Sequence, residues 1–231
     1  MRGNIKEHKG KDLKGKRIGI VGGTFNPIHL GHLRSAEENR ETYDLSRVIF
    51  IPSATPPHKD SGNIIDAKHR YKMVKRAVSS NCNFVASDIE LKREGKSYTI
   101  DTLKYFKERV GDEGEIYFII GLDAFIEIET WMNFRELFEY SHFVVTDRPD
   151  SESKSPQFVM PEGISDAFEK QTDGEQDFWI HTSKSRLYFQ DISALDISST
   201  VIRGLIRDGK SISYLVPESV NKYIKKRGLY H

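Results

Sequence analysis

Short apolar runs alternate along this chain with longer segments of helical periodicity. The alternation favours right-handed strand–helix–strand crossovers, so it predicts an α/β fold built on a doubly wound parallel sheet covered on both faces. Ligands bind such sheets beyond the carboxyl ends of the strands, and site residues are therefore expected just after strands. The expected strands are 17–21, 48–51, 84–89, 116–120, 142–146 and 186–192, and the expected helices are 33–43, 66–78, 99–109, 131–138 and one that opens near Ser198.

Chain length and local composition predict one domain with two irregular parts. A chain of 231 residues is long enough for one sizeable α/β domain and short for two. Residues 1–16 are rich in Lys and Gly and lack apolar periodicity, which predicts a flexible N-terminal tail before a domain at 17–231. Residues 149–182 are rich in Ser, Glu, Asp, Gly and Pro. We interpret them as an irregular insertion that serves as a plain surface loop, a cover for the cleft or a contact in a homo-oligomer.

The charge balance gives no reason to expect an extended anionic partner. The 35 basic and 34 acidic side chains nearly cancel, so we expect no nucleic-acid partner and no membrane partner. The longest apolar runs are far shorter than the roughly 20 residues of a membrane helix, and the N-terminus lacks an apolar signal core, which predicts a cytoplasmic location. The single cysteine, Cys82, excludes an internal disulfide and a cysteine-based zinc cage.

The segment 22–32 lies where the first expected strand turns into the first expected helix, and it reads Gly-Gly-Thr-Phe-Asn-Pro-Ile-His-Leu-Gly-His. Glycines allow a phosphate to approach the backbone closely, and the N–H groups of a helix N-terminus favour anions. His29 and His32 are three residues apart, which places both imidazoles on one side of the first helical turn. Either ring can donate a hydrogen bond to phosphate oxygens whose charge grows in a transition state.

Three other interpretations of this segment were weighed. Two histidines can bind zinc, but no cysteine or neighbouring third ligand supports such a site. The segment lacks the Gly-Lys-Ser/Thr ending of a Walker loop and does not match the GxGxxG fingerprint. An isolated His-x-Gly-His would be interpreted by default as a non-functional glycine turn with two solvated histidines. The eleven-residue context that follows a strand here disfavours that interpretation.

The string GGTFNPIHLGHL resembles the N-terminal signature of the adenylyltransferases that make dinucleotide cofactors, within the HxGH nucleotidyltransferase superfamily. The string ISSTVIR at 197–203 resembles the C-terminal motif of the same proteins, and a serine-rich helix start with a cation suits a triphosphate. Three middle segments are similar to the nicotinate-nucleotide adenylyltransferase family. They are 52–59 with its PPHK loop, 93–103 with SYTIDTL, and 120–125 with an IGxD turn.

The resemblance implies a Rossmann-like single domain that transfers AMP from ATP to nicotinate mononucleotide in NAD biosynthesis. It implies Mg²⁺ that is carried with ATP rather than bound by a dedicated set of side chains. The implied catalytic residues are His29, His32 and Arg203. The implied ATP-binding residues are Gly22, Gly23, Thr24, Phe25, Asn26, Gly31, His32, Ile197, Ser198, Ser199, Thr200 and Arg203, and the implied acceptor-binding residues are Lys59, Ser97, Tyr98, Thr99, Asp123 and Trp131.

Several alternatives stay open at the level of sequence. The acceptor could be nicotinamide mononucleotide, phosphopantetheine or a lipid-precursor phosphate, and the protein could be a nucleotide sensor without turnover. A tRNA-synthetase fragment is a further alternative, because HxGH also occurs in class I aminoacyl-tRNA synthetases and 182–186 faintly resembles their KMSKS loop. Individual residues also have structural explanations: Lys59 as a solvated lysine, Trp131 as core, Ser97 and Thr99 as helix caps, and Asp123 as a loop brace.

Overall fold

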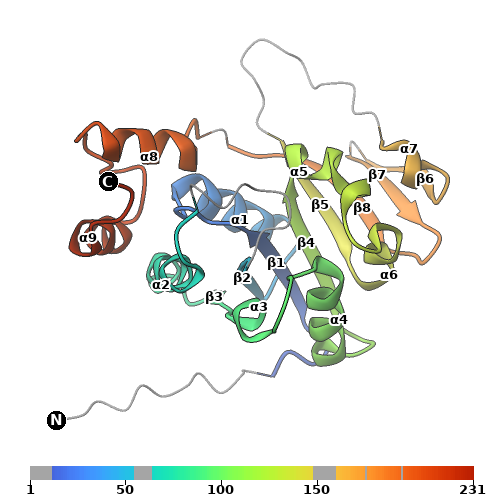
Figure 1. Cartoon of the computed structure of the whole chain (residues 1–231). Coiled ribbons are helices and arrows are strands. Elements are labelled where there is room, and N and C mark those ends of the chain that lie inside the picture. Colours follow the sequence, from blue (N-terminus) through green and yellow to red (C-terminus); the bar gives the residue numbers. More distant parts are fainter. Residues whose placement is uncertain (1–11, 55–63, 148–159, 175, 194) are drawn as a thin grey trace.

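A single eight-stranded sheet forms the centre of the computed structural model, which describes residues 12–54, 64–147, 160–174, 176–193 and 195–231 (Figure 1). The strand order is β3-β2-β1-β4-β5-β8-β7-β6. The pairings from β3 through β8 are parallel, and β7 and β6 extend the sheet antiparallel. The strands are β1 (Arg17–Gly23), β2 (Arg47–Pro52), β3 (Phe84–Ala86), β4 (Glu115–Gly121), β5 (His142–Asp147), β6 (Phe168–Asp173), β7 (Gln176–His181) and β8 (Arg186–Asp191). The doubly wound α/β prediction is confirmed.

Helices cover both faces of the sheet. One face carries α1 (Leu30–Thr42), α2 (Ala67–Ala77), α8 (Ser199–Arg207) and α9 (Glu218–Arg227). The other carries α4 (Thr99–Val110), α5 (Leu122–Ile126), α6 (Leu137–Tyr140) and α7 (Glu162–Ser165). The remaining short elements are α3 (Ile89–Lys92), η2 (Ile128–Thr130) and η3 (Phe134–Glu136). No helix among the described residues is long and apolar enough to cross a membrane.

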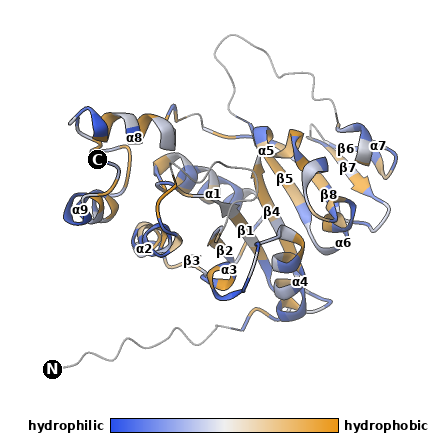
Figure 2. Ribbon diagram, in the orientation of Figure 1, coloured by the Kyte–Doolittle hydropathy of each residue, from blue (hydrophilic) through white to orange (hydrophobic). Residues whose placement is uncertain are grey.

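The strands feed two separate cores because side chains of a strand alternate between the two faces of the sheet. In β2, Val48 and Phe50 belong to the cluster under α1 and α2, whereas Ile49 and Ile51 belong to the cluster under α4. The central strands β4 and β5 are therefore hydrophobic along most of their length, as Figure 2 shows. Such continuous apolar runs are typical of parallel strands buried on both sides.

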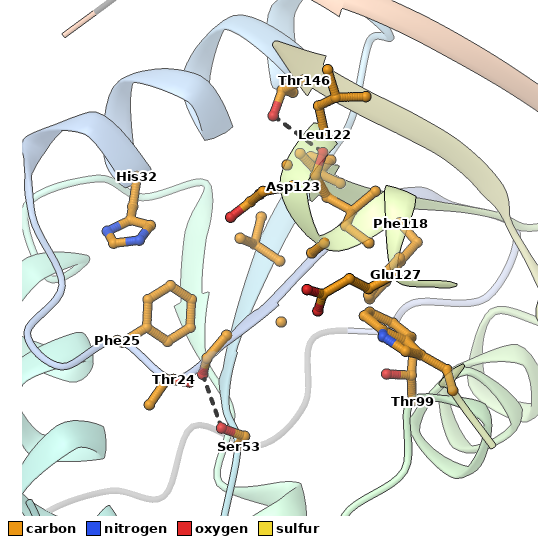
Figure 3. A pocket seen from close by; sticks show the side chains of 18 of the residues that line it. Thr24, Phe25, His32, Ser53, Thr99, Phe118, Leu122, Asp123, Glu127 and Thr146 are labelled. Carbon is orange, nitrogen blue, oxygen red and sulfur yellow. Dashed lines mark hydrogen bonds between the residues drawn. The ribbon is translucent and has the colours of Figure 1, made fainter. Parts of the chain in front are cut away.

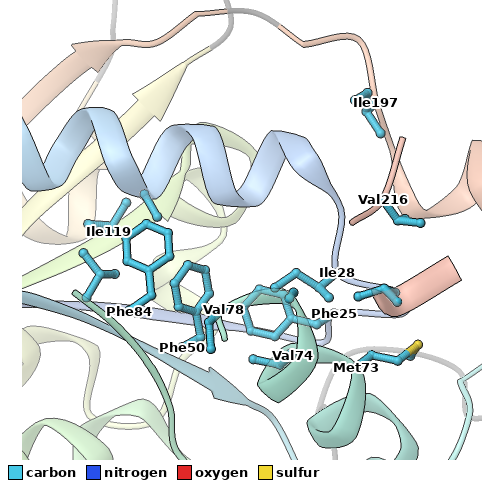
Figure 4. Packing of buried hydrophobic residues seen from close by; sticks show 14 of the residues in the cluster. Phe25, Ile28, Phe50, Met73, Val74, Val78, Phe84, Ile119, Ile197 and Val216 are labelled. Carbon is cyan, nitrogen blue, oxygen red and sulfur yellow. The ribbon is translucent and has the colours of Figure 1, made fainter. Parts of the chain in front are cut away.

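The first core reaches from the sheet to the C-terminal helices. The ring of Phe50 lies 6.1 Å from that of Phe25 and 5.1 Å from that of Phe84, and Ile197 and Val216 extend the cluster toward α8 and α9 (Figure 4). Phe25 belongs to the loop after β1, so the loop that precedes α1 is anchored in this core. Burial of the large apolar side chain of Phe25 thus holds this loop in place against the core.

The insertion expected at 149–182 is only partly irregular. Residues 148–159 lie outside the described residues, but 162–165 form α7, and β6 (168–173) pairs antiparallel with β7 (176–181) to form the β6–β7 hairpin. Composition concealed the hairpin because β6 is an edge strand with exposed polar side chains. In the neighbouring strand β7, Phe178 and Trp179 pack on opposite faces of the sheet. The hairpin therefore completes both cores, and the fold is one domain.

Three smaller expectations are corrected by the structure. The helix expected at 131–138 is broken, because Trp131 is extended and Asn133 is left-handed with φ of 50°, so only η3 and α6 form. The third strand ends at Ala86, and Ile89 begins α3. The domain begins before residue 17, because the Gly15 N–H donates to the Val110 carbonyl at 2.8 Å. Residues 1–11 of the expected tail lie outside the described residues.

Candidate active site

A cavity of about 1470 Å³ opens beyond the carboxyl ends of β1 and β4. Strand order reverses between these two strands, and ligands of doubly wound sheets bind at such a switch point. Pockets for one small ligand typically measure about 300–1,000 Å³, so this cavity has room for two substrates side by side. The residues implied by the sequence that line it are Gly22, Gly23, Thr24, Phe25, Asn26, Gly31, His32, Ser97, Tyr98, Thr99, Asp123, Trp131, Ser198, Ser199, Thr200 and Arg203.

The two histidines at the start of α1 occupy different positions. His32 lines the cavity and faces it from the first turn of the helix (Figure 3). His29 is the N-cap residue, is only 2% exposed, and is not among the lining residues. Its ring lies behind that of His32, with a centroid separation of 3.6 Å. The structure thus puts the His32 ring at the cavity and the His29 ring behind it, and the contacts of both rings with a ligand stay predictions.

Gly31 is required by this stacked arrangement. A Cβ at position 31 would lie 3.1 Å from Nδ1 and 3.2 Å from Cε1 of His29, so any side chain there would press on that ring. The backbone N–H of His29 donates to Nδ1 of His32 at 3.2 Å. Because Nδ1 accepts this bond, the proton of a neutral His32 ring is on Nε2, which makes the exposed edge a hydrogen-bond donor.

The N-terminus of α8 is tied to the loop before α1. Ser198 caps the helix, because its Oγ accepts from the Val201 N–H at 3.1 Å. The Ser199 hydroxyl donates to the Pro27 carbonyl at 2.8 Å, and Arg203 donates to the Asn26 carbonyl at 2.8 Å. The Arg203 guanidinium also lies 3.2 Å from the Thr200 hydroxyl. Two segments far apart in sequence thereby form one wall rich in donors and positive charge.

Ile197, the first residue of the second motif, packs in the hydrophobic core. Its side chain is 8% exposed and belongs to the first core, and it is not among the residues that line the cavity. The implied contact of Ile197 with ATP stays a prediction. The apolar residue before Ser198 anchors the start of α8 so that the polar residues after it face the cavity.

The opposite wall carries the residues assigned to the acceptor. Ser97, Tyr98 and Thr99 precede or begin α4, and all three line the cavity. The Trp131 ring packs edge-on against Phe118 with centroids 6.2 Å apart, so the indole is held from behind by β4. Asp123 lies in the first turn of α5 and points into the cavity, as does Glu127 (Figure 3). Lys59 lies outside the described residues.

Arg70 of α2 was not anticipated from the sequence. It is 1% exposed, and its guanidinium donates to the carbonyls of Thr24 and Ser53 at 2.7 Å each. It also donates to Ala54 at 3.1 Å and Ile65 at 3.0 Å. Burial lowers the pKa of the guanidinium below its usual value. Arg70 therefore braces the loops after β1 and β2. It shares the i, i+3, i+4, i+7 spacing of the buried Met73, Val74 and Ala77, so helical periodicity was the signal that could have placed it on the buried face.

Glu90 of α3 is a second unanticipated residue of the wall. It is 8% exposed, lines the cavity, and accepts a hydrogen bond from the Thr102 hydroxyl at 3.0 Å. Arg93 lies on the other side of the same hydroxyl at 2.9 Å. Burial raises the pKa of the Glu90 carboxyl, and the Thr102 hydrogen bond and the Arg93 charge oppose that rise. Lys96, also unanticipated, lines the cavity near the start of α4.

The segment that resembles a KMSKS loop lies elsewhere. Residues 182–186 form the turn between β7 and β8 and the start of β8, and none of them lines the cavity. The Ser183 hydroxyl donates to the Phe138 carbonyl at 2.9 Å, which holds the turn against α6. The structure thus removes one of the two observations behind the tRNA-synthetase alternative, and the HxGH motif is the other.

The described residues offer no group of three or more His, Cys, Asp or Glu side chains that could hold a metal ion. Asp123 and Glu127 both point into the cavity, and two carboxylates can share a hydrated ion with substrate phosphates. The donor set therefore suits a divalent cation that arrives on a polyphosphate and keeps most of its ligands from phosphate and water.

Comparisons with known proteins agree with this architecture. The family described as Cytidylyltransferase-like matches residues 20–205. The chain is similar to a protein of Plasmodium falciparum, nicotinic acid mononucleotide adenylyltransferase complexed with NaAD, with a TM-score of 0.67 and 20% identity over 93% of this chain and 97% of that one. At this identity the likeness shows the fold, which is the Rossmann-like nucleotidyltransferase fold.

Two bacterial relatives are much more similar in sequence. A protein of Desulfatibacillum aliphaticivorans named probable nicotinate-nucleotide adenylyltransferase is 44% identical over 218 residues, covering 93% of this chain and 99% of the relative. A protein of the same name from Geobacter sp. (strain M21) is 44% identical over 214 residues, covering 93% of this chain and 98% of the relative. This chain therefore belongs to the nicotinate-nucleotide adenylyltransferase family of cytidylyltransferase-like proteins.

Proposed function

We propose that this protein transfers AMP from ATP to nicotinate mononucleotide, forming nicotinate adenine dinucleotide and pyrophosphate. The observation that carries the proposal is one continuous cavity with two chemically different walls. One wall joins His32 to the start of α8 and suits a triphosphate. The other joins residues 97–99 to Trp131 and suits a nucleotide with an aromatic ring.

The reaction is a direct in-line displacement. A 5′-phosphate oxygen of the mononucleotide attacks the α-phosphorus of ATP, a new P–O bond forms, and the bond to the bridging α,β-oxygen breaks, so that pyrophosphate leaves with the electron pair. No protein nucleophile is needed, because positioning and charge neutralisation supply most of the acceleration in phosphoryl-type transfer. ATP enters as a complex with a divalent metal ion, which we assign as Mg²⁺.

Each wall has a defined role in this proposal. His32 donates Nε2–H to the reacting phosphate, and His29 acts through His32 by stacking behind it. Arg203, the Thr200 hydroxyl and the backbone N–H of Ser199 hold the β- and γ-phosphates, since the Ser199 hydroxyl donates to the Pro27 carbonyl. The glycines at 22, 23 and 31 allow the polyphosphate to approach the backbone, and Thr24 and Asn26 orient it.

The acceptor end uses a different set of contacts. The Trp131 ring offers a stacking surface for the pyridine, and Phe118 limits its rotation. The segment 97–99 provides hydroxyls and the helix N-terminus of α4 for the anionic groups of the mononucleotide. We assign Asp123 to a ribose hydroxyl and Lys59, which lies outside the described residues, to the acceptor phosphate. We further propose a cytoplasmic protein whose partners are its two substrates, with homo-oligomerisation open to direct measurement.

The proposal is tested by pyrophosphate release with Mg-ATP and a panel of acceptors. Nicotinate mononucleotide should give the highest kcat/KM, ahead of nicotinamide mononucleotide and phosphopantetheine. Higher kcat/KM with either of the other two would reassign the acceptor, and ATP binding without turnover on any acceptor would favour the sensor alternative. His32→Ala should lower kcat by about 10²–10³-fold, the effect of removing one preorganised donor. His69→Ala is the matched control, since His69 bonds to Tyr223 on α9 outside the cavity.

A further inference from the structure

The residues that follow α9 turn back toward the nucleotide wall. Helix α9 ends at Gly228, whose left-handed backbone, with φ of 57°, reverses the chain. The Leu229 N–H then donates to the Ile224 carbonyl at 3.2 Å, and Leu229 and Tyr230 pack against the first core. This turn carries the Tyr230 hydroxyl to Asn26, 204 positions earlier in the chain, where it donates to Oδ1 at 3.0 Å.

Asn26 is a meeting point for three distant segments. Its side-chain Oδ1 accepts from the Tyr230 hydroxyl and, at 3.4 Å, from the Ile65 N–H. Its backbone carbonyl accepts from Arg203 of α8. The Ile65 N–H can only donate, so the amide presents its oxygen on this side, and the Tyr230 hydroxyl, which can donate or accept, donates to the same oxygen. Asn26 is 5% exposed and lines the cavity.

The conformation of Tyr230 indicates that its position is imposed by contacts. Its φ is 71°, in the left-handed region that a tyrosine adopts only at a cost. Burial raises the pKa of the Tyr230 hydroxyl, so the group keeps its proton and remains a donor at every pH at which the protein would be assayed. The nearby charges of Arg203 and Arg70 oppose this rise. The hydroxyl thus lies beside the two guanidinium groups that organise the loop before α1.

We propose that Tyr230 is a positioning residue of the nucleotide site, which acts by fixing the Asn26 amide and so the contacts of the loop 22–32 with the polyphosphate of ATP. It does not touch the substrate, because it is not among the residues that line the cavity. The proposal rests on the proposed function only for the identity of the nucleotide. It assigns to the C-terminal turn a role in ATP affinity that neither sequence motif includes.

The test compares Tyr230→Phe with Tyr214→Phe, a matched control. Tyr214 also has a positive φ, of 65°, but is 90% exposed. Calorimetry with Mg²⁺ and α,β-methylene ATP should show affinity about three- to tenfold weaker in Tyr230→Phe, the effect of one lost hydrogen bond, and unchanged in Tyr214→Phe. In turnover, KM for ATP should rise while KM for the acceptor stays the same. The ring is retained, so the core packing and the fold should survive.

A double-mutant cycle identifies the mediator. In an Asn26→Ala background, Tyr230→Phe should cause no further loss, because the amide that it positions is gone. Wild-type affinity in Tyr230→Phe, or an equal loss in both backgrounds, overturns the proposal, as does a lower melting temperature with unchanged affinity. Failure of the proposed function can be told apart from failure of the Tyr230 proposal. In the first case wild-type protein would bind the analogue but form no dinucleotide, and the double-mutant cycle on binding would still decide the role of Tyr230. If wild-type protein does not bind the analogue, both proposals are wrong.

Discussion

Replacement of Arg70 by Met should be among the most destabilising single changes in this protein. The guanidinium bonds to four backbone carbonyls, those of Thr24, Ser53, Ala54 and Ile65, at 2.7–3.1 Å. Hydrogen bonds to a charged group contribute about 1.5–3 kcal/mol each, but burying the guanidinium offsets part of the sum. Removal of one partner of a buried charged interaction typically costs about 3–5 kcal/mol, and we expect that range for Arg70→Met.

The assay is equilibrium unfolding in urea, followed by tryptophan fluorescence. A loss of about 3–5 kcal/mol corresponds to a melting temperature lower by roughly 6–20 °C in a domain of this size. Arg70→Lys should cost less, about 1–3 kcal/mol, because an ammonium keeps the charge but cannot span four carbonyls. Arg76→Met on the same helix is the control, since Arg76 is exposed. Its guanidinium lies over the ring of Tyr223, and its carbonyl, which the substitution keeps, accepts from Ser79 and Ser219. Arg70→Met within about 0.5 kcal/mol of wild type would refute the bracing role.

Three further predictions concern the cavity. Gly31→Ala should lower kcat at least about tenfold by displacing the His29 ring. The melting temperature should change little, because alanine favours a helix over glycine by up to about 1 kcal/mol. The control is Gly204→Ala on α8, where a Cβ meets nothing within 4 Å, and it should keep full activity. Burial raises the pKa of Glu90 above its usual 4.5, so the folded protein holds this proton more tightly than the unfolded chain. Stability should therefore fall as pH rises from below 4.5 through the raised pKa. In a series of thermal melts between pH 4 and 7, Glu90→Gln should flatten that fall. In steady-state kinetics, Trp131→Ala should raise KM for the mononucleotide about tenfold and leave KM for ATP unchanged. Trp131→Phe keeps an aromatic ring and should bring KM for the mononucleotide most of the way back to the wild-type value. Equal effects on both substrates would contradict the stacking role.

Much of the site followed from local sequence. Glycines after a buried strand, a histidine in the first helical turn and a serine cap before an arginine each have a local physical reason to form an anion site. The structure brings Gly22, His32 and Arg203 to one cavity, as the two motifs implied. The periodicity of the apolar residues likewise predicted the parallel strands, because burial on both faces leaves a continuous apolar run.

Other features depended on contacts between distant residues. The β6–β7 hairpin was hidden because an edge strand with one exposed face has the composition of a loop. The inward turn of His29 depends on Gly31 and on stacking with His32, neither of which a spacing of three residues specifies. Asn133 broke the expected helix at 131–138 through a single left-handed residue, which helix propensity did not predict.

The sequence by itself determined the parallel part of the sheet, the two polar helix starts and the chemistry that they favour, because strand burial, helix capping and backbone access to a phosphate are local properties. Only the tertiary structure decided which groups share the cavity and which hold it in place. Glu90 and Tyr230 carry no local signal, and the periodicity that puts Arg70 on the buried face of α2 does not reveal its partners. Each of the three acts through partners that are distant in the chain or brought close only by the turn of a loop. Their roles exist only once packing has buried them beside the loops that they fix.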